Sequence, residues 1–213
     1  MKKEKYFSYR NINKKASGLL RKLNDLDHKE QEFIFDKSAL LVLDMQNYFT
    51  DKDSHAFIPS VDAIIGNINR LILKFESGNR PIIITQHFNN VAEGGMMLKW
   101  WNDYIKKGTN YFNVDRRIKV QNIKIIEKQF YDAFFNTELD LSMKEKSVQQ
   151  VVICGVMTHL CCDSTARSAF MRNYQVFFTV DGTATYLESF HNSTIVNLSH
   201  GFVRPVITDM LIS

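Results

Sequence analysis

A carboxylate, an ammonium group and a thiol each follow a separate apolar run of this 213-residue chain. Asp44 ends SALLVLD, Lys128 ends IKIIEK, and Cys161 comes shortly after VVICGV. A thiol becomes a strong nucleophile only as a thiolate. A nearby carboxylate can take the proton and return it to a leaving group, and an ammonium group favours the negative charge. These residue types therefore suit acyl transfer through a thioester, with hydrolysis of an amide or ester.

Helical periodicity distinguishes the two adjacent cysteines. On a helix, Cys162 shares its face with Ala166, Ala169 and Phe170, and Cys161 shares its face with Thr165, Ser168 and Arg172. We therefore interpret Cys162 as a packing residue, like Cys154 in the preceding apolar run, and Cys161 as the reactive thiol. Thr158 is expected to begin the helix, which places Cys161 in the first turn. The dipole and free N–H groups there favour negative charge and can stabilise an oxyanion.

Short apolar runs alternate with amphipathic segments from residue 38 onward. Strands are predicted over 38–45, 80–86, 123–128, 148–156, 175–180 and 202–208, and helices over 61–78, 137–146, 161–173 and 187–201. This alternation predicts a three-layer α/β/α fold with a central, mostly parallel sheet of five to six strands. Ligands bind beyond the carboxyl ends of such strands, so Asp44, Lys128 and Cys161 are expected to meet there.

The N-terminal part of the chain lies outside this alternation. Residues 1–40 carry ten Lys and Arg against six Asp and Glu, and the remainder is neutral, so the formal charge of +4 belongs to the N-terminal part. MKKEKYFSYRNINKK is typical of a charged, poorly ordered arm, and one extra helix is expected over 13–36. We therefore divide the chain into a basic arm and helix, 1–35, and a hydrolase domain, 36–213.

Composition argues against several classes of protein. The body lacks the basic stripe with interleaved aromatic residues that is typical of nucleic-acid binding, so no nucleic-acid partner is expected. No apolar run reaches the about 18–20 residues needed to cross a bilayer, so no membrane partner is expected. Three cysteines, an odd number, do not indicate a disulfide framework, and a reduced, cytoplasmic setting is predicted. The expected partner is a small-molecule substrate.

The longest stretch without a predicted strand, 87–122, contains both tryptophans. Long loops in compact α/β domains are usually functional, so we interpret this stretch as a lid or pocket wall. The residues expected to line the pocket are Gln46, Gln86, His87, Trp100, Trp101, Tyr131 and Phe135. His87 fits a substrate contact and a structural histidine equally well, and at least one of Tyr131 and Phe135 is expected to be core. His55, in DKDSHAFIP, is interpreted as part of a solvated turn.

Three stretches resemble the isochorismatase-like cysteine hydrolases: LLVLDMQNYF, IIEKQFYDAFFNTELD and VVICGVMTHLCCDSTARSAFMRNYQVFFTVDGTAT. The resemblance covers about residues 36–208 in the family's order and spacing. It implies that Asp44, Lys128 and Cys161 form the family's catalytic triad, and that the Val156–Met157 peptide bond is cis. It further implies that the backbone N–H groups of Met157 and Cys161 form an oxyanion hole, and that the protein is a dimer or tetramer.

Departures from the family pattern narrow the expected chemistry. True isochorismatases typically have Gly where Cys161 stands and hold a carboxylate with an Arg, which FNNVAEGGMMLKWW lacks. Nicotinamidases carry an Asp-x-His metal motif where this chain reads Gln86-His87-Phe88-Asn89. We therefore expect a metal-independent enzyme with no cofactor and no nicotinamide activity. Two alternatives stay open: vinyl-ether hydrolysis with Asp44 as general acid, and a non-catalytic binding subunit that docks through its basic arm.

Overall fold

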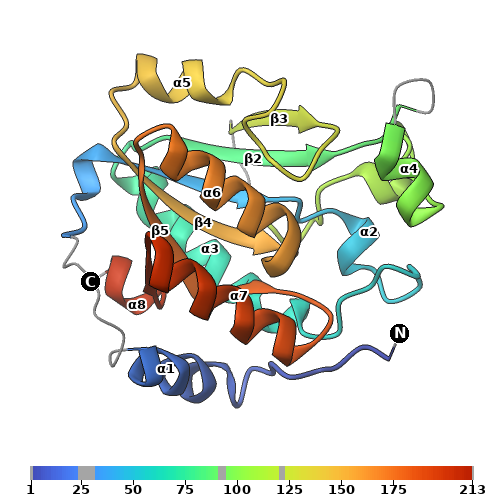
Figure 1. The fold of residues 1–213 in the computed structure, drawn as a ribbon, viewed down its shortest axis with the longest axis horizontal. Coiled ribbons are helices and arrows are strands. Elements are labelled where there is room, and N and C mark those ends of the chain that lie inside the picture. The colour runs from blue at the N-terminus through green and yellow to red at the C-terminus, as the bar shows by residue number, and fades with distance from the viewer. Residues whose placement is uncertain (1, 24–31, 91–94, 120–122, 213) are drawn as a thin grey trace.

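Six parallel strands form the central sheet in the order β3-β2-β1-β4-β5-β6. The computed structural model describes residues 2–23, 32–90, 95–119 and 123–212. The strands are β1 Ser38–Leu43, β2 Ile82–His87, β3 Lys124–Lys128, β4 Gln150–Val156, β5 Gln175–Ala184 and β6 Val203–Val206. Helices cover both faces (Figure 1), which confirms the predicted three-layer α/β/α fold.

The strand order places the centre of the sheet between β1 and β4. The chain first builds outward from β1 through β2 to β3, and then returns to the other side of β1 to add β4, β5 and β6. The loops after β1 and β4 therefore leave in opposite directions and open a crevice at the carboxyl ends of these two strands. Asp44 directly follows β1, and the segment that carries Cys161 directly follows β4.

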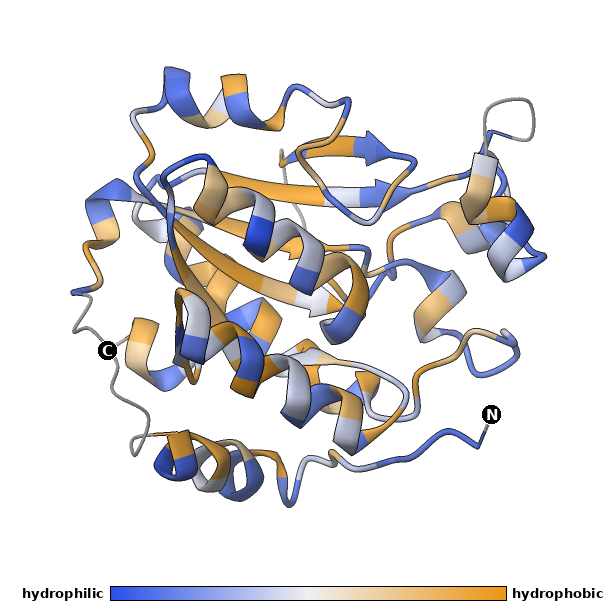
Figure 2. Cartoon of the chain, in the orientation of Figure 1, coloured by the Kyte–Doolittle hydropathy of each residue, from blue (hydrophilic) through white to orange (hydrophobic). Residues whose placement is uncertain are grey.

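Successive residues of β1 pack into two different cores, because side chains alternate between the faces of a strand. Leu40 and Val42 belong to the core shared with α3, Val61–Ser77. Ala39, Leu41 and Leu43 belong to the core on the other face, which is covered by α5 Leu139–Glu145, α6 Asp163–Met171 and α7 Glu188–Gly201. Figure 2 shows hydrophobic residues throughout the central strands and a mixture of both kinds along the helices.

The segment after β4 differs in detail from the predicted helix over 161–173. A π-helical turn, Thr158–Cys162, precedes α6. Cys162, Ala166 and Ala169 are buried as predicted, but Phe170 is 48% exposed and stacks on Phe202 instead of entering the core. The short helices α2 Asn47–Thr50, α4 Gly95–Trp101 and α8 Asp209–Ile212 were not predicted.

The N-terminal residues pack against the body, contrary to the expected poorly ordered arm. Tyr6 and Phe7 are buried; the Tyr6 hydroxyl accepts the Thr185 N–H at 2.9 Å, and the Phe7 N–H donates to Ser60 Oγ at 3.0 Å. An aromatic pair inside a charged stretch explains the difference, because its burial stabilises the arm against the body. The division of the chain into 1–35 and 36–213 stays a prediction.

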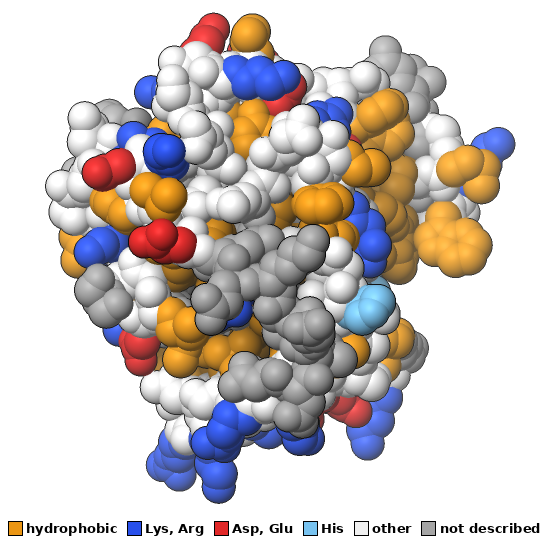
Figure 3. Space-filling model, turned by 60° about the vertical axis from the view of Figure 1, so that its left-hand side comes forward, with side chains coloured by type: hydrophobic (Ala, Val, Ile, Leu, Met, Phe, Trp, Pro, Cys, Tyr) orange, Lys and Arg blue, Asp and Glu red, His pale blue; other side chains and the backbone are white. Residues whose placement is uncertain are grey.

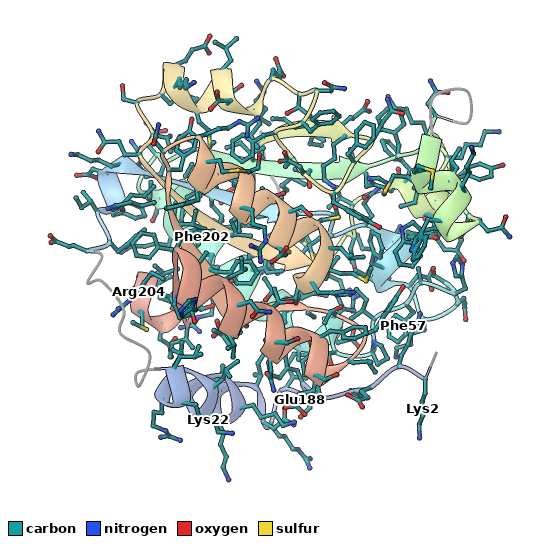
Figure 4. All side chains as sticks on the ribbon, in the orientation of Figure 1. Lys2, Lys22, Phe57, Glu188, Phe202 and Arg204 are labelled. Carbon is teal, nitrogen blue, oxygen red and sulfur yellow. The ribbon has the colours of Figure 1, made fainter. Side chains whose placement is uncertain are left out.

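The helix expected over 13–36 is shorter than predicted. Helix α1 spans Ile12–Leu23, and a 3₁₀ turn spans Phe35–Lys37, with part of the predicted span outside the described residues. Lys15 pairs with Glu188 of α7 at 2.8 Å, and Figure 4 shows Lys22 pointing away from the body. In Figure 3, Lys and Arg side chains gather along the lower edge, at the height of α1 in Figure 1. Among the described helices, none is long and apolar enough to span a membrane.

Candidate active site

The structure brings Asp44, Lys128 and Cys161 together at the carboxyl edge of the sheet. Lys128 Nζ lies 2.7 Å from Asp44 Oδ2 and 3.4 Å from Cys161 Sγ. Lys128 is the last residue of β3, which is separated from β1 by β2. Its long side chain therefore has to cross the end of β2 to reach the other two residues. In Figure 1 the arrowheads of β2, β3 and β4 point toward the side where α2 and α4 lie.

The Lys128 ammonium group is held by one ion pair and two hydrogen bonds. It pairs with Asp44 at 2.7 Å and donates to Cys161 Sγ at 3.4 Å and to the Phe130 carbonyl oxygen at 2.9 Å. The side chain is fully buried. A buried charge of this kind is retained only when it is paired and hydrogen-bonded, so the orientation of the ammonium group is fixed.

Thr85, in the middle of β2, holds the other side of the Asp44 carboxylate. Its hydroxyl donates to Asp44 Oδ1 at 2.6 Å and accepts the Asp44 N–H at 3.1 Å. Asp44 itself has a φ of 50°, in the left-handed region that non-glycine residues seldom occupy. We did not predict Thr85. A hydroxyl inside a buried apolar strand needs a hydrogen-bond partner. Its presence in the predicted strand was therefore the sequence signal that could have indicated a role for Thr85.

The charges of the site follow from burial and from several favourable interactions. Burial is the largest single influence and opposes ionisation of Asp44 and Lys128, but their mutual attraction, added to neighbouring charges and hydrogen bonds, outweighs it, so the pKa of Asp44 is lowered and that of Lys128 is raised. Burial, followed by the Asp44 carboxylate, raises the pKa of Cys161 despite the lowering effect of Lys128. The free protein therefore holds a neutral thiol beside a carboxylate. Lys128 does favour the thiolate, as the sequence led us to expect, but burial and the Asp44 carboxylate outweigh its effect.

Cys161 lies in the π-helical turn Thr158–Cys162, immediately before α6. The Val156–Met157 peptide bond that leads into this turn is cis. The Leu160 and Cys162 N–H groups both donate to the Met157 carbonyl oxygen, at 3.1 and 3.3 Å. Cys162 and Cys154 are fully buried in the two cores, one on each face of the sheet.

A cavity of about 90 Å³ opens above Cys161. Of the residues predicted to line a pocket, His87, Trp101 and Tyr131 do so, together with Met157 and Cys161. Trp101 Nε1 donates to the Tyr131 hydroxyl at 2.6 Å, which ties α4 to the loop after β3. The cavity lining is mostly apolar, as the linings of small-molecule binding sites are.

Four predicted pocket residues lie elsewhere. Gln46 and Gln86 are structural, because both amides donate to the Phe112 carbonyl oxygen and Gln46 also bonds the backbone of His87 at both its N–H and its C=O. Trp100 is 76% exposed on α4, and Phe135 packs against Phe130 on the surface. A glutamine beside a sheet edge can form hydrogen bonds with backbone groups as readily as with a substrate. The sequence alone does not distinguish these two roles.

Several cavity residues were missed, above all Tyr48, His55 and Asp103. His55 was expected in a solvated turn; its ring is exposed, but Nε2 lies 3.0 Å from Asp103 Oδ2 and 3.2 Å from the Tyr48 hydroxyl. The Tyr48 hydroxyl donates to Asp103 Oδ2 at 2.6 Å. These residues come from α2, the loop after it and the segment after α4, so their meeting depends on tertiary structure alone.

The segment at the nicotinamidase metal motif carries a hydrogen-bonded pair in this chain. His87 Nε2 lies 3.3 Å from the Asn89 amide nitrogen, and burial lowers the pKa of His87 to about 3, so the imidazole is neutral. One imidazole and one amide are a poorer donor set for zinc than the acidic and histidine side chains of that motif. Within the described ranges, no group of three or more His, Cys, Asp or Glu side chains is placed to hold an ion.

Comparison with known proteins identifies the family. The family model described as Isochorismatase domain matches residues 38–210, and the chain therefore belongs to the isochorismatase family. It is a hydrolase of that family, as the names of its relatives indicate.

Individual relatives differ in the activity that their names give. Nicotinamidase 3 of Arabidopsis thaliana is 35% identical over 179 residues, covering 82% of this chain and 86% of that protein. Enterobactin synthase component B of Escherichia coli is 26% identical and covers 89% of this chain and 68% of that protein. A cysteine hydrolase structure from Pseudomonas syringae superposes with a TM-score of 0.82 at 20% identity, covering 87% of this chain and 95% of that one. The last likeness supports the fold alone.

Proposed function

We propose that the protein is a cysteine hydrolase that cleaves an amide or ester bond of a small molecule without a metal ion. Cys161 is the nucleophile, Asp44 moves the proton, and Lys128 orients Asp44 and balances its charge. The observation that carries the proposal is the buried contact set: Lys128 Nζ at 2.7 Å from Asp44 and at 3.4 Å from Cys161, at the base of a cavity.

The first half of the reaction forms a thioester. Asp44 accepts the Cys161 proton as the sulfur attacks the carbonyl carbon, and the carbonyl π electrons move onto oxygen. The N–H groups of Met157 and Cys161 donate to that oxyanion. When the intermediate collapses, the carbon–nitrogen or carbon–oxygen bond breaks and Asp44 gives its proton to the departing amine or alcohol.

The second half releases the acid. Asp44, again ionised, takes a proton from a water molecule that attacks the thioester carbonyl. The carbon–sulfur bond then breaks, the proton returns to sulfur, and the carboxylic acid leaves. Because the raised pKa of Cys161 leaves few thiolates in the free protein, the rate depends on Asp44 in both halves.

Labelling with iodoacetamide tests the roles of the residues. Cys161 should be alkylated faster than Cys154 or Cys162, as read by peptide mass spectrometry, and Asp44→Asn should suppress that labelling at least about tenfold. Cys162→Ala is the matched control, since it removes the neighbouring sulfur from the core. Equal labelling of the three cysteines in the folded protein would refute the assignment.

Hydrolysis of a panel of small amides and esters tests the activity, with a trapped acyl adduct on Cys161 detected by intact mass. Nicotinamide belongs in the panel because a 35% identical relative is named a nicotinamidase; the altered motif at Gln86–Asn89 predicts no turnover of it.

Isochorismate belongs in the same panel because another relative is named Isochorismatase. Turnover of isochorismate that survives Cys161→Ala would replace the proposal with vinyl-ether hydrolysis by Asp44. Retained biological function in a Cys161→Ala, Asp44→Ala double variant would instead indicate the non-catalytic binding subunit. Homo-oligomer formation and a cytoplasmic setting remain predictions, and analytical ultracentrifugation tests the first of them.

A further inference from the structure

Among the described residues, the cavity lining contains one carboxylate, on Asp103, which lies 3.0 Å from the His55 ring. None of the described lining residues is Lys or Arg. Lys128 lies beneath the cavity, but its charge is balanced by Asp44 at 2.7 Å, and both side chains are fully buried. A substrate in the cavity therefore meets a neutral ion pair at the Cys161 end and a negative charge where Asp103 stands.

Asp103 is held in place with room for another hydrogen bond. Its Oδ1 accepts the Tyr104 N–H at 2.8 Å, and its Oδ2 accepts the Tyr48 hydroxyl at 2.6 Å. A carboxylate offers about four acceptor positions, so acceptor capacity remains even when His55 also donates to Oδ2. Burial, together with the Asp103 carboxylate, raises the pKa of Tyr48, and this keeps the phenol protonated and donating.

Most of the other residues that line the cavity are apolar or aromatic. Phe49, Trp101, Tyr131, Met157 and Leu160 all line the cavity. Such side chains favour contact with an apolar or aromatic body, and a carboxylate on that body would be repelled by Asp103 and find no Lys or Arg among the described lining residues. Burying an unpaired anion in a mostly apolar site is strongly unfavourable.

We propose that Asp103, positioned by Tyr48, is a specificity residue that selects neutral or cationic aromatic substrates, whose N–H or ammonium group binds its carboxylate while the scissile amide or ester lies at Cys161. This assignment rests on the proposed function and adds the substrate class. This substrate class differs from that of relatives that act on carboxylates. The substrate group that binds Asp103 is a hydrogen-bond donor, whereas a carboxylate is an acceptor.

Charged thiol reagents test the assignment without requiring hydrolysis. Cys161 is modified at pH 8, where an ordinary imidazole is neutral, by methanethiosulfonates that carry an aminoethyl or a sulfonatoethyl group. Each rate is divided by the rate of the same reagent with 2-mercaptoethanol. The normalised preference for the cationic reagent should fall at least about fivefold in Asp103→Asn, as the loss of one nearby charge implies.

Two control variants distinguish the loss of the Asp103 charge from other effects of the substitution. Asp103→Glu retains the carboxylate and should keep the wild-type preference. Asp53→Asn removes the same charge from the loop that carries His55, but Asp53 is exposed and does not line the cavity, so it too should keep the preference. An unchanged ratio in Asp103→Asn, or an equal fall in Asp53→Asn, overturns the assignment.

Equilibrium binding gives a second readout that does not depend on the reactivity of Cys161. Benzamide, 4-(aminomethyl)benzamide and 4-carboxybenzamide are titrated calorimetrically into the Cys161→Ala variant, with and without Asp103→Asn. The cationic amide should bind at least about fivefold more tightly than the anionic one, and Asp103→Asn should abolish the difference. Tighter binding of the carboxylate, or binding of none of the three, refutes the substrate class. Failure of the iodoacetamide experiment refutes the hydrolase mechanism instead, so the two results are distinguishable.

Discussion

At the scale of single residues, the site depends on the Asp44 carboxylate, each of whose oxygens has a close polar neighbour. Asp44 receives the Thr85 hydroxyl at 2.6 Å on one oxygen and the Lys128 ammonium at 2.7 Å on the other. Both partners favour the ionised form, which offsets the cost of burying it. Asp44 can therefore remain a base although its side chain is fully buried, and this is the property that the proposed attack by a neutral thiol at Cys161 requires.

Replacing Thr85 with valine should weaken both stability and reactivity. The variant keeps the shape of the side chain but removes a hydrogen bond to a charged group, which costs about 1.5–3 kcal/mol. It should also slow the alkylation of Cys161 several-fold, because a less well-oriented carboxylate is a poorer base. Denaturant unfolding and mass-spectrometric labelling measure the two effects.

Thr208→Val is the matched control for Thr85→Val. The Thr208 hydroxyl donates to another buried carboxylate, Asp181 Oδ1, at 3.0 Å, and neither residue lines the cavity. Its loss should lower stability by a similar amount and leave the labelling of Cys161 unchanged. If Thr85→Val alters stability alone, as the control does, Thr85 does not act on the site.

At the scale of secondary-structure elements, the close approach of β1 and β4 positions Asp44 relative to the turn that carries Cys161. Gly155, paired in register with Leu43, has a φ of 111°. A Cβ atom at this position would lie 2.1 Å from the Leu43 carbonyl oxygen, far inside van der Waals contact. Both the backbone conformation and the strand separation therefore require glycine here.

Gly155→Ala should destabilise the protein by more than about 2 kcal/mol, because either β1 or β4 must move and φ is strained. Gly66→Ala is the matched control: Gly66 is exposed in the middle of α3, and nothing lies within 4 Å of the added Cβ. This substitution should stabilise the protein by about 0.5–1 kcal/mol. Urea unfolding of both variants checks the opposite signs, and equal effects would contradict the interpretation.

At the scale of the whole molecule, two buried neutral histidines make folding sensitive to acid. Burial lowers the pKa of His87 and of His191 to about 3. Between pH 6.5 and 3 the unfolded chain therefore binds more protons than the folded one, so the free energy of unfolding falls as the pH falls. Each histidine contributes a slope of up to about 1.4 kcal/mol per pH unit in this window.

His191→Gln should reduce the slope of the unfolding free energy against pH by up to about 1.4 kcal/mol per pH unit, the contribution of one proton. His191 lies away from the cavity, bonded to the Thr158 hydroxyl and packed on Tyr6 and Phe7, so the measurement does not depend on catalysis. Exposed His200→Gln is the control for loss of an imidazole and should keep the wild-type slope. Urea unfolding at several pH values between 7 and 4 gives the slopes, and an unchanged slope in His191→Gln would show that its burial is not the cause.

The sequence determined the fold class and the catalytic candidates, because both depend on local patterns. Alternating apolar runs specify strands and helices of a parallel α/β sheet, and polar residues at the ends of those runs must lie at one edge. Asp44, Lys128 and Cys161 were predicted in this way, and the periodicity after Cys162 predicted that its sulfur is buried.

Only the tertiary structure decided what surrounds those residues. Strand order, which brings Lys128 across β2, depends on packing between elements distant in the sequence, and so does the meeting of Tyr48, His55 and Asp103. The protonation of Cys161 was decided there as well, since burial and a neighbouring carboxylate outweigh the ammonium group. Local patterns specify which residues face an edge of the sheet, whereas distances and burial, which set charge and specificity, arise only when the elements pack.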